Sequence, residues 1–402
     1  MRILSLTTIY PNEQVAAEGR SVAFLDRALA KLGVQGTTLV LKPWTPHWLA
    51  GRVNKWKHLA VQRRIAERDG LRTAFSHYFH IPYRFQRDLC VYSMAHQAIR
   101  LIRKHGWEFD IVHGQSIYPA APAARLVARH YQVPFVVTLR DDLSHLSYWY
   151  EHRKGREIFE PMFASVSAIF VHGPSLLRDI PKFIPSGSHP NILMASNGVD
   201  QEGIQSILNS LHPPAQRPWG SIVSVSSLYR LKGIHESLQA LRFLIEGGLK
   251  DWRYTIVGDG PYRKELEALS KGLGLEPQVA FVGSVPHPEA IRYIRDADIF
   301  SLPSWGEAFG NVYPEAAVCG RPAIGCRGYG AELTIRHGET GLLVAPKDVG
   351  DLAKALGFLL THPDRAREMG EEGRRHIRQF TWDQTAQIYK QAIGRILTKG
   401  SE

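Results

Sequence analysis

Short runs of β-branched and aliphatic residues alternate with amphipathic stretches along the chain, and this rhythm constrains the fold more than any other feature. In the first half the runs are RILSLT, GTTLVLK, DIVHG, PFVVTLR and AIFVHG, and stretches such as Val22–Leu32 between them have helical spacing. Strands that alternate with helices form parallel βαβ units. The first half is therefore expected to form a doubly wound parallel sheet.

A second series of such runs follows, made of SIVSVSSL, RYTIVGDG, VAFVGS, DIFSLPS, PAIGC and GLLVA. The proline-rich stretch HPPAQRPWG lies between the two series and predicts a boundary close to it. A chain of 402 residues also exceeds the size at which single cores stop growing. We expect an α/β fold of two Rossmann-like domains, 1–196 and 197–380, that face a cleft, with a final segment 381–402. Ligands of such sheets bind beyond the carboxyl ends of the strands.

Composition indicates a soluble cytoplasmic protein, because no apolar run reaches the roughly 20 residues of a membrane span and no signal peptide is evident. The three cysteines lack metal-type spacing. The net charge of +11 implies an anionic partner, and residues 42–90 alone carry ten Lys/Arg against three acids, together with aromatic residues that include Trp44, Trp48 and Trp56. This segment is either a solvated helical face or a docking patch for an anionic membrane or acceptor.

The segment EAFGNVYPE places Glu307 and Glu315 eight positions apart, after the expected strand DIFSLPS. A helix beginning near Asn311 or Val312 would point its positive end at the preceding loop, which contains Phe309 and Gly310, and would favour a phosphate or a polarised sugar there. Glu307 would lie in the loop, and Glu315 could accept hydrogen bonds from a ribose diol. The alternative is that the acids only compensate the helix dipole, which suits Glu315 but does not explain Glu307.

This segment resembles the E-x7-E signature of the retaining glycosyltransferases of family four, which have the GT-B fold. YRLKG, VGDGP, FVGSVP and GETGLLV resemble neighbouring motifs of that family, and the match is close over 197–380. The first half resembles the family mainly in its alternation of expected strands and helices. The resemblance implies a hexosyltransferase that moves a sugar from a nucleotide diphosphate sugar to a hydroxyl acceptor, with retention at the anomeric carbon and without a metal. Synthesis of a surface polysaccharide, lipopolysaccharide or glycolipid is the implied setting.

The resemblance also implies roles for individual residues. Glu307 would contact the donor sugar and Glu315 the ribose, while Lys232 would neutralise the leaving diphosphate. Ser284 and Val285 match positions whose backbone reads the nucleobase, and Gly258 belongs to a tight turn that lines the nucleotide pocket. The family arginine is replaced by Ser227, so Arg230 is either its substitute or a solvent-facing charge.

The first half departs further from the family pattern. Gly19 matches a glycine loop that approaches diphosphate or acceptor, but Glu18 stands in place of the first glycine. His113 and Gln115 occupy the places of a histidine pair, so either residue could act at the reaction centre, or His113 could be structural. Arg140 could grip a phosphate or an anionic acceptor.

Other motifs and functions are less well supported. Asp296 and Asp298 have metal-type spacing but precede their strand, so we interpret them as a helix exit and a strand entry. The rival functions are a GT-B-like epimerase or phosphorylase, and a non-catalytic binder of nucleotide sugar or nucleic acid. Lys232 together with Glu307 argues for catalysis, and no nucleic acid is expected as a partner. The acceptor could be lipid-linked, which would place the protein at the inner membrane face.

Overall fold

The computed structural model describes residues 1–11, 19–44, 64–68, 70–79, 87–140, 143–213 and 217–399. The chain divides into two compact units. Unit 1 comprises Met1–His172, Leu176–Gly198 and Trp382–Glu402, and unit 2 comprises Gly173–Ser175 and Val199–Thr381.

Unit 1 contains an eight-stranded sheet with the order β3-β4-β2-β1-β5-β6-β7-β8, in which only β3 runs antiparallel to its neighbour. Its strands are β1 (Arg2–Thr7), β2 (Gln35–Pro43), β3 (Arg64–Arg68), β4 (Leu71–Tyr78), β5 (Ile111–Gly114), β6 (Phe135–Leu139), β7 (Ala168–Val171) and β8 (Asn191–Met194). The five strands predicted for this half are confirmed, and β3, β4 and β8 are additional.

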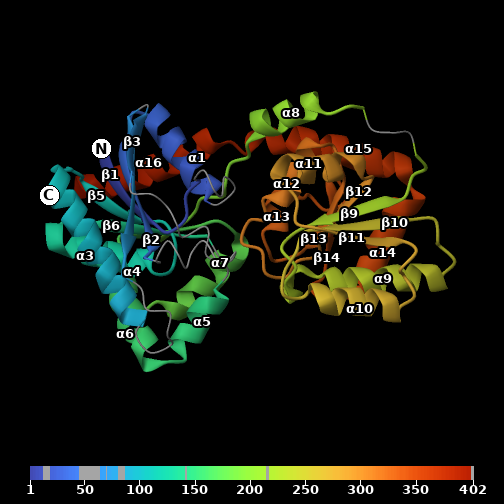
Figure 1. Cartoon of the computed structure of the whole chain (residues 1–402), viewed down its shortest axis with the longest axis horizontal. Coiled ribbons are helices and arrows are strands. Elements are labelled where there is room, and N and C mark those ends of the chain that lie inside the picture. The colour runs from blue at the N-terminus through green and yellow to red at the C-terminus, as the bar shows by residue number, and fades with distance from the viewer. Residues whose placement is uncertain are drawn as a thin grey trace. The chain divides into compact units, whose positions relative to one another are not determined.

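Helices cover both faces of this sheet, with α1 and α16 on one side and α3 and α4 on the other (Figure 1). The helices are α1 (Arg20–Lys31), α3 (Arg87–His105), α4 (Ala120–Tyr131), α5 (Ser144–Tyr150), α6 (Arg153–Ser165), α7 (Pro174–Asp179), the 3-10 turn η2 (Ile180–Phe183) and α16 (Trp382–Lys399). The last helix packs Tyr389 against Phe170 of β7, with ring centroids 3.9 Å apart. The end of the chain therefore completes the core of unit 1.

The hairpin of β3 and β4 corrects one prediction. The sequence predicts either a solvated helical face or a docking patch for residues 42–90, but 64–68 and 71–78 are paired strands, so the helical alternative is wrong there. Lys42 is buried at 2% exposure and belongs to β2, whereas Trp44 is 52% exposed. Trp48 and Trp56 lie outside the described residues.

Unit 2 contains a six-stranded parallel sheet with the order β11-β10-β9-β12-β13-β14. Its strands are β9 (Ser221–Val225), β10 (Arg253–Val257), β11 (Val279–Gly283), β12 (Ile299–Ser301), β13 (Ala323–Cys326) and β14 (Gly341–Val344). All six match the runs of the second series. The strand order reverses direction between β9 and β12, which is where ligands of doubly wound sheets bind.

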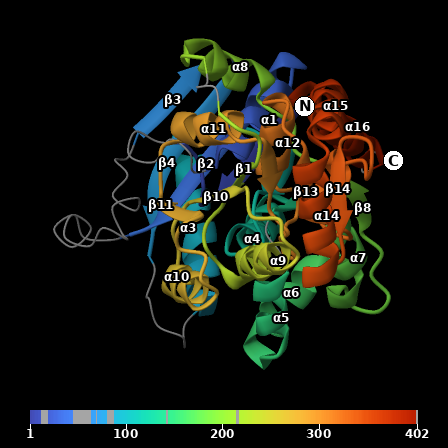
Figure 2. The same cartoon turned by 90° about the vertical axis from the view of Figure 1, so that its right-hand side faces the viewer.

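The helices of unit 2 also lie on both faces of their sheet. They are α8 (Gln201–Ser210), α9 (Ile234–Glu246), α10 (Arg263–Gly272), α11 (His287–Asp296), α12 (Val312–Val318), α13 (Ala331–Thr334), α14 (Val349–Thr361) and α15 (Pro363–His376), with 3-10 turns η3 (Arg230–Lys232) and η4 (Ile377–Gln379). Figures 1 and 2 show α11 and α12 on one side and α9, α10 and α14 on the other. The two units divide after Gly198, close to the expected bound between 196 and 197, and both α8 and the proline-rich stretch after it belong to unit 2.

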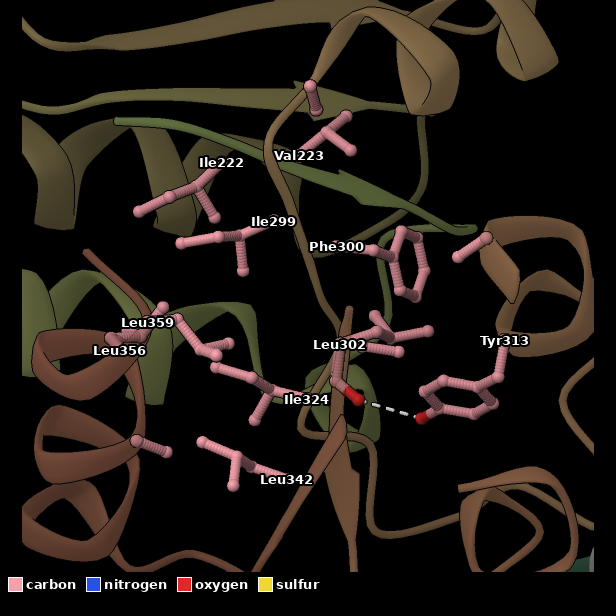
Figure 3. Packing of buried hydrophobic residues seen from close by; sticks show 14 of the residues in the cluster. Ile222, Val223, Ile299, Phe300, Leu302, Tyr313, Ile324, Leu342, Leu356 and Leu359 are labelled. Atoms are coloured by element: carbon pink, nitrogen blue, oxygen red, sulfur yellow. Dashed lines mark hydrogen bonds between the residues drawn. The ribbon is translucent and has the colours of Figure 1, made fainter. Parts of the chain in front are cut away.

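Aliphatic residues of β9, β12, β13 and α14 form the core of unit 2, as the packing in Figure 3 shows. The members labelled there include Ile222, Ile299, Ile324 and Leu356. Because parallel strands covered on both faces lie in the interior, they read as continuous apolar runs in the sequence. Among the helices of the described part of the chain, none is both long and apolar enough to cross a bilayer.

Candidate active site

In unit 2, the polar residues predicted from the sequence gather at the carboxyl ends of β9 and β12. These strands are parallel neighbours, with Ile299 beside Ile222 and Phe300 beside Val223. The turn η3 follows β9, and the loop that carries Glu307 follows β12. The carboxyl ends of parallel neighbours meet at one edge of the sheet, so the two loops lie side by side.

Close backbone contacts hold these two loops together. Trp305 donates its backbone N–H to the carbonyl of Leu231 over 2.9 Å, and the Ser304 hydroxyl donates to the same carbonyl over 3.1 Å. Gly233 has φ +73°, and a Cβ there would overlap the carbonyl of Pro303. A side chain at position 233 would therefore push the loops apart.

This loop packing brings Lys232 to Glu307, 75 residues along the chain. The Lys232 ammonium donates to Oε1 of Glu307, and the two side chains are only 17% and 16% exposed. The pair is thus fixed in place but retains access to solvent. An ammonium held this way can stabilise negative charge that develops on a leaving group.

Glu315 lies in the first turn of α12 and has a partner that the sequence analysis did not identify. His287, the first residue of α11, shares a hydrogen bond of 2.9 Å between Nε2 and Oε1 of Glu315. Their side chains are 25% and 16% exposed. The only sequence signal for His287 is its position directly after the motif FVGSVP.

Tyr313 fixes α12 onto the end of β12. Its hydroxyl donates to the carbonyl of Leu302 over 2.7 Å, as Figure 3 shows, and its ring meets Phe300 edge-on with centroids 5.9 Å apart. Burial, followed by the nearby carboxylate of Glu307, holds the pKa of Tyr313 well above its usual range, so the phenol stays a donor. The predicted helix start is confirmed, since Asn311 is the N-cap and Val312 the first helical residue.

The loop before α12 is shaped by its backbone. Gly310 has φ +76°, and a Cβ there would lie 2.5 Å from the Tyr313 ring. Phe309 is buried, with 3% of its surface exposed, so it serves the core rather than presenting a side chain to a ligand. Any contact of Phe309 with a nucleotide would be through its backbone.

The residues predicted to line the nucleotide pocket follow β10 and β11. Gly258 has φ +130° and pairs with Gly283, and its close approach to the Ser226 carbonyl leaves no room for a Cβ. Ser284 is exposed and Val285 packs partly against the core. The Ser226 hydroxyl is buried and has no hydrogen-bond partner within the described ranges.

Arg230 and Lys232 share the turn η3 but differ in environment. Arg230 is exposed, whereas Lys232 is largely buried against Glu307. Ser227, which stands at the place of the family arginine, is also exposed. The turn therefore carries a second cation, Arg230, which forms no ion pair with another residue that the structure describes.

Unit 1 contains the other predicted residues. Gly19 is the N-cap of α1 with φ +68°, and a Cβ there would lie 2.5 Å from the carbonyl carbon of Ile9. The loop after β1 thus approaches the start of α1 so closely that only glycine fits. Glu18 lies outside the described residues.

His113, Gln115, Thr138, Arg140 and His172 form a buried polar cluster at the carboxyl ends of β5, β6 and β7. Nε2 of His113 lies 2.7 Å from the Thr138 hydroxyl, which in turn lies 2.9 Å from the hydroxyl of Tyr389. His113 is fully buried, and this burial, with a smaller effect of Arg140, lowers the pKa of His113 to about 3. These contacts are those of a neutral, structural histidine, and a role in catalysis stays a prediction.

Arg140 bridges the rest of this cluster. It donates to Oε1 of Gln115 over 2.5 Å, and its other terminal nitrogen lies 3.0 Å from Nε2 of His172. Nδ1 of His172 lies 2.6 Å from the carbonyl of Ala195, so Nδ1 is the donor and Nε2 accepts from Arg140. Burial is the main cause that holds the pKa of His172 well below its usual range. Within the described part, Nε2 of Gln115 and Nδ1 of His113 have no hydrogen-bond partner.

The Asp-x-Asp motif is structural, as the sequence analysis predicted. Asp298 precedes β12 and accepts hydrogen bonds from the backbone N–H groups of Gly220 and Ser221, both over 2.9 Å. Burial opposes its ionisation, but these bonds and the contact with Arg217 outweigh it and hold the pKa of Asp298 below its usual range. The carboxylate thus joins the starts of β9 and β12.

Two protein-family models match the chain. Residues 19–202 match Glycosyltransferase Family 4, and residues 220–376 match Glycosyl transferases group 1. The matched ranges include every strand of the two sheets except β1. They leave out residues 1–18, 203–219 and 377–402.

Curated relatives and solved structures agree with these models. A D-inositol 3-phosphate glycosyltransferase of Corynebacterium kroppenstedtii is 35% identical over 43% of this chain, and the chain spans 40% of that relative's length. One from Corynebacterium urealyticum is 28% identical over 72% of both chains. The structure of Anabaena HepE in complex with UDP-glucose aligns over 98% of this chain and 100% of its own, with a TM-score of 0.68 and 16% identity, which shows a shared fold. Both parts of the chain are therefore similar to glycosyltransferases, and the chain has the GT-B fold.

Proposed function

We propose that this enzyme transfers a hexosyl group from a nucleoside diphosphate sugar to a hydroxyl acceptor, with retention of the anomeric configuration. The proposal rests on two carboxylates of unit 2 that are held in place by hydrogen bonds. Glu307 accepts one from Lys232, and Glu315 shares one with His287. One lies in the loop after β12, and the other lies in the first turn of the helix that follows. An elongated donor could contact both.

Lys232 is proposed to stabilise the leaving diphosphate. When the bond between the anomeric carbon and the phosphate oxygen breaks, negative charge grows on that oxygen. A cation that is already in position needs no reorganisation at that moment. Lys232 would supply this charge without a metal, so activity should persist in the presence of a chelator.

Glu307 and Glu315 are proposed to orient the two ends of the donor. Each carboxylate has one oxygen engaged, on Lys232 or His287, and a carboxylate has lone pairs for further donors. Glu307 would accept from hydroxyls of the sugar, and Glu315 from the ribose diol. Backbone groups at Ser284 and Val285 would meet the base, so nucleotide choice depends little on side chains there.

Retention would follow if the acceptor attacks the anomeric carbon on the same face from which the diphosphate leaves. The acceptor oxygen forms its bond to the anomeric carbon while the bond to phosphate breaks, and the acceptor proton passes to the departing phosphate oxygen. This route needs no separate general base. NMR of the first product formed would reveal the anomer, and an inverted product would contradict this step.

The donor is tested first by thermal stability with UDP, GDP, ADP, dTDP and their glucose or mannose conjugates. A ligand at about 100 times its Kd should add about 2.7 kcal/mol. We expect one base to stabilise the protein and Glu315→Ala to reduce that shift. UDP is a natural first choice, because the HepE structure of the same fold contains UDP-glucose.

The same assay separates the rival functions. A phosphorylase would require inorganic phosphate for turnover, and an epimerase would change the donor sugar without an acceptor. A non-catalytic binder would show the stability shift, but it would neither transfer the sugar nor slowly hydrolyse the donor. A nucleic-acid binder would bind duplex with a steep dependence on salt.

The acceptor is proposed to be a polyol or glycan, including lipid-linked ones, that is reached at the inner face of the membrane. Two of the relatives are named D-inositol 3-phosphate glycosyltransferase, and these names support a polyol as the acceptor to test first. The basic segment 42–90 motivates peripheral binding, and Trp44 and Phe79 within it are 52% and 57% exposed. Sedimentation with phosphatidylcholine vesicles with and without phosphatidylglycerol tests this, and unchanged binding after neutralising the Lys/Arg of 52–64 would contradict it.

A further inference from the structure

A polar cavity lies in unit 2 at the edge of the sheet opposite the candidate active site. It has a volume of about 370 Å³, within the range of small-molecule pockets. We call it the arginine pocket, and its lining residues are Arg217, Trp219, Asp298, Gly320, Arg321, Arg367, Glu371 and Arg374. These residues precede β9, β12 and β13 or lie on α15, so the pocket opens at the amino ends of the strands.

Three of the four arginines in this pocket have carboxylate partners. Arg217 lies 2.7 Å from Asp298, and Arg374 lies 3.1 Å from Glu371. Arg367 lies 2.7 Å from Asp364, outside the lining. The lining itself holds four arginines against two carboxylates, which leaves an excess of positive charge.

Arg321 is the exception. Its guanidinium forms no ion pair in the part of the chain that the structure describes, and its Nε is buried without a hydrogen-bond partner there. Burial, together with the nearby positive charges of Arg217 and Arg374, lowers the pKa of Arg321 although other neighbours oppose this. A buried donor without a partner is costly, and the cost is larger for a charged group.

The backbone is shaped to bring α15 to this site. Gly320 has φ +69°, and a Cβ there would overlap the guanidinium of Arg374. A Cβ at Gly370 would likewise overlap the carbonyl of Gly320. Gly320 and Gly370 thus allow α15 and the turn before β13 to approach each other closely. Charged side chains of both segments line the cavity.

We propose that the arginine pocket binds a phosphomonoester-type anion, either inorganic phosphate or the phosphate group of a sugar phosphate, with Arg321 as its central contact. The planar guanidinium fork suits bidentate phosphate binding, and a dianion would compensate the excess positive charge. Trp219, with Arg367 stacked 4.9 Å from its ring centroid, supplies a wall against which a sugar ring could lie. The proposal does not depend on the donor assignments at the opposite edge of the sheet.

Calorimetric titration of the full chain with inorganic phosphate and with glucose 6-phosphate, at constant ionic strength, tests the proposal. We expect saturable binding of at least one of them and a loss of about tenfold or more in affinity in Arg321→Gln, because hydrogen bonds to charged groups contribute roughly 1.5–3 kcal/mol. The matched control is Arg242→Gln, which removes an arginine from the exposed Arg242–Glu246 pair on α9 and should leave the affinity unchanged. Binding of inorganic phosphate alone identifies free phosphate as sufficient, whereas binding of only the sugar phosphate assigns the sugar a share of the contacts.

Two further measurements separate this site from the candidate active site. Saturation with the preferred nucleotide should not displace the anion, and Lys232→Ala should weaken the nucleotide without weakening the anion. Arg367→Gln is a second pocket variant if Arg321→Gln fails to fold, and we expect it to weaken the anion by about threefold to tenfold. No saturable binding, displacement by the nucleotide, or equal affinity in the pocket variants would overturn the proposal.

Discussion

The two units present polar side chains at the carboxyl ends of their strands in different ways. In unit 2, the Lys232–Glu307 and His287–Glu315 pairs retain between 16% and 25% of their side-chain surface. In unit 1, His113 and Gln115 are completely buried and bond to other residues of their own unit. The same position in a doubly wound sheet thus carries a solvent-accessible pair of ions in one unit and a closed hydrogen-bonded cluster in the other.

This difference separates two uses of polar residues. Partly exposed ions can exchange a partner or solvent for a ligand at small cost, since they are still hydrated. A buried cluster offsets much of its desolvation cost with internal hydrogen bonds and therefore resists rearrangement, although Nδ1 of His113 and Nε2 of Gln115 have no partner among the described residues. We infer that unit 2 supplies the charges that act on the donor, while the cluster of unit 1 holds its strand ends in place.

The largest effect is expected for Lys232→Ala, which should lower kcat by about 100- to 1,000-fold, or about 3–4 kcal/mol, as loss of one stabilising group at a developing charge does. The thermal midpoint should change little, because the pair is not at the core. Steady-state kinetics and a melting curve measure the two effects. The exposed Lys264→Ala is the control, and a Lys232→Ala enzyme with more than half of the kcat would contradict the role of this pair.

The next effect concerns the pH dependence of stability in unit 1. The folded pKa of His113 is about 3, below its unfolded value of 6.5, so the unfolded chain binds more protons between these values and stability falls as the pH falls below 6.5. At about pH 5 the loss in the free energy of unfolding that is due to His113 is about 2 kcal/mol. In His113→Gln this part of the slope should disappear.

Urea unfolding of the wild type and the variant at several pH values between about 6.5 and 5 measures the difference, in which the contributions of all other groups cancel. Exposed His96→Gln is the matched control and should follow the wild type. Parallel curves for wild type and His113→Gln would show that His113 becomes protonated in the folded state, and would reopen a role for it in proton transfer.

A smaller effect is expected for His287→Ala, which removes the partner of Glu315. The partly exposed hydrogen bond should be worth about 1 kcal/mol, so nucleotide affinity should fall about fivefold with little change in kcat. Calorimetry with the preferred nucleoside diphosphate measures this, with exposed His189→Ala as the control. If affinity is unchanged in His287→Ala but falls in Glu315→Gln, the histidine does not position the carboxylate.

The smallest effect is expected for Arg230→Ala. An exposed cation near a diphosphate should contribute about 0.5–1 kcal/mol, which would raise the donor KM by about threefold and shrink at high salt. Donor KM at low and high salt measures it. A loss of 100-fold or more would instead identify Arg230 as the substitute for the arginine missing at Ser227.

Much of the fold could be predicted because its signals are local. Buried parallel strands such as β9 and β10 are continuous apolar runs, and amphipathic helices lie between them. Strands β3, β4 and β8 were missed because LRTAFSHY mixes polar and apolar residues and NILM is only four residues long. Pairing makes them strands, of β4 with β2, of β3 with β4 and of β8 with β7, and the sequence of one segment does not contain that information.

The candidate site could be predicted only where family motifs mark it. Glu307 and Glu315 belong to one short segment, and the resemblance identified Lys232. His287 could not be assigned, since its partner Glu315 is 28 residues away and nothing near His287 indicates the contact. The arginine pocket is similar, because its residues come from four separate segments.

The sequence by itself determined the alternation of strands and helices, the start of α12 and the two carboxylates at that helix, since each depends on residues close together in the chain. Tertiary structure decided which charges meet. Gly233 lets one loop approach Pro303 and so brings Lys232 to Glu307, and burial inside unit 1 makes His113 a neutral partner of Thr138. Contacts and burial involve residues far apart in sequence, so they exist only once the chain has folded.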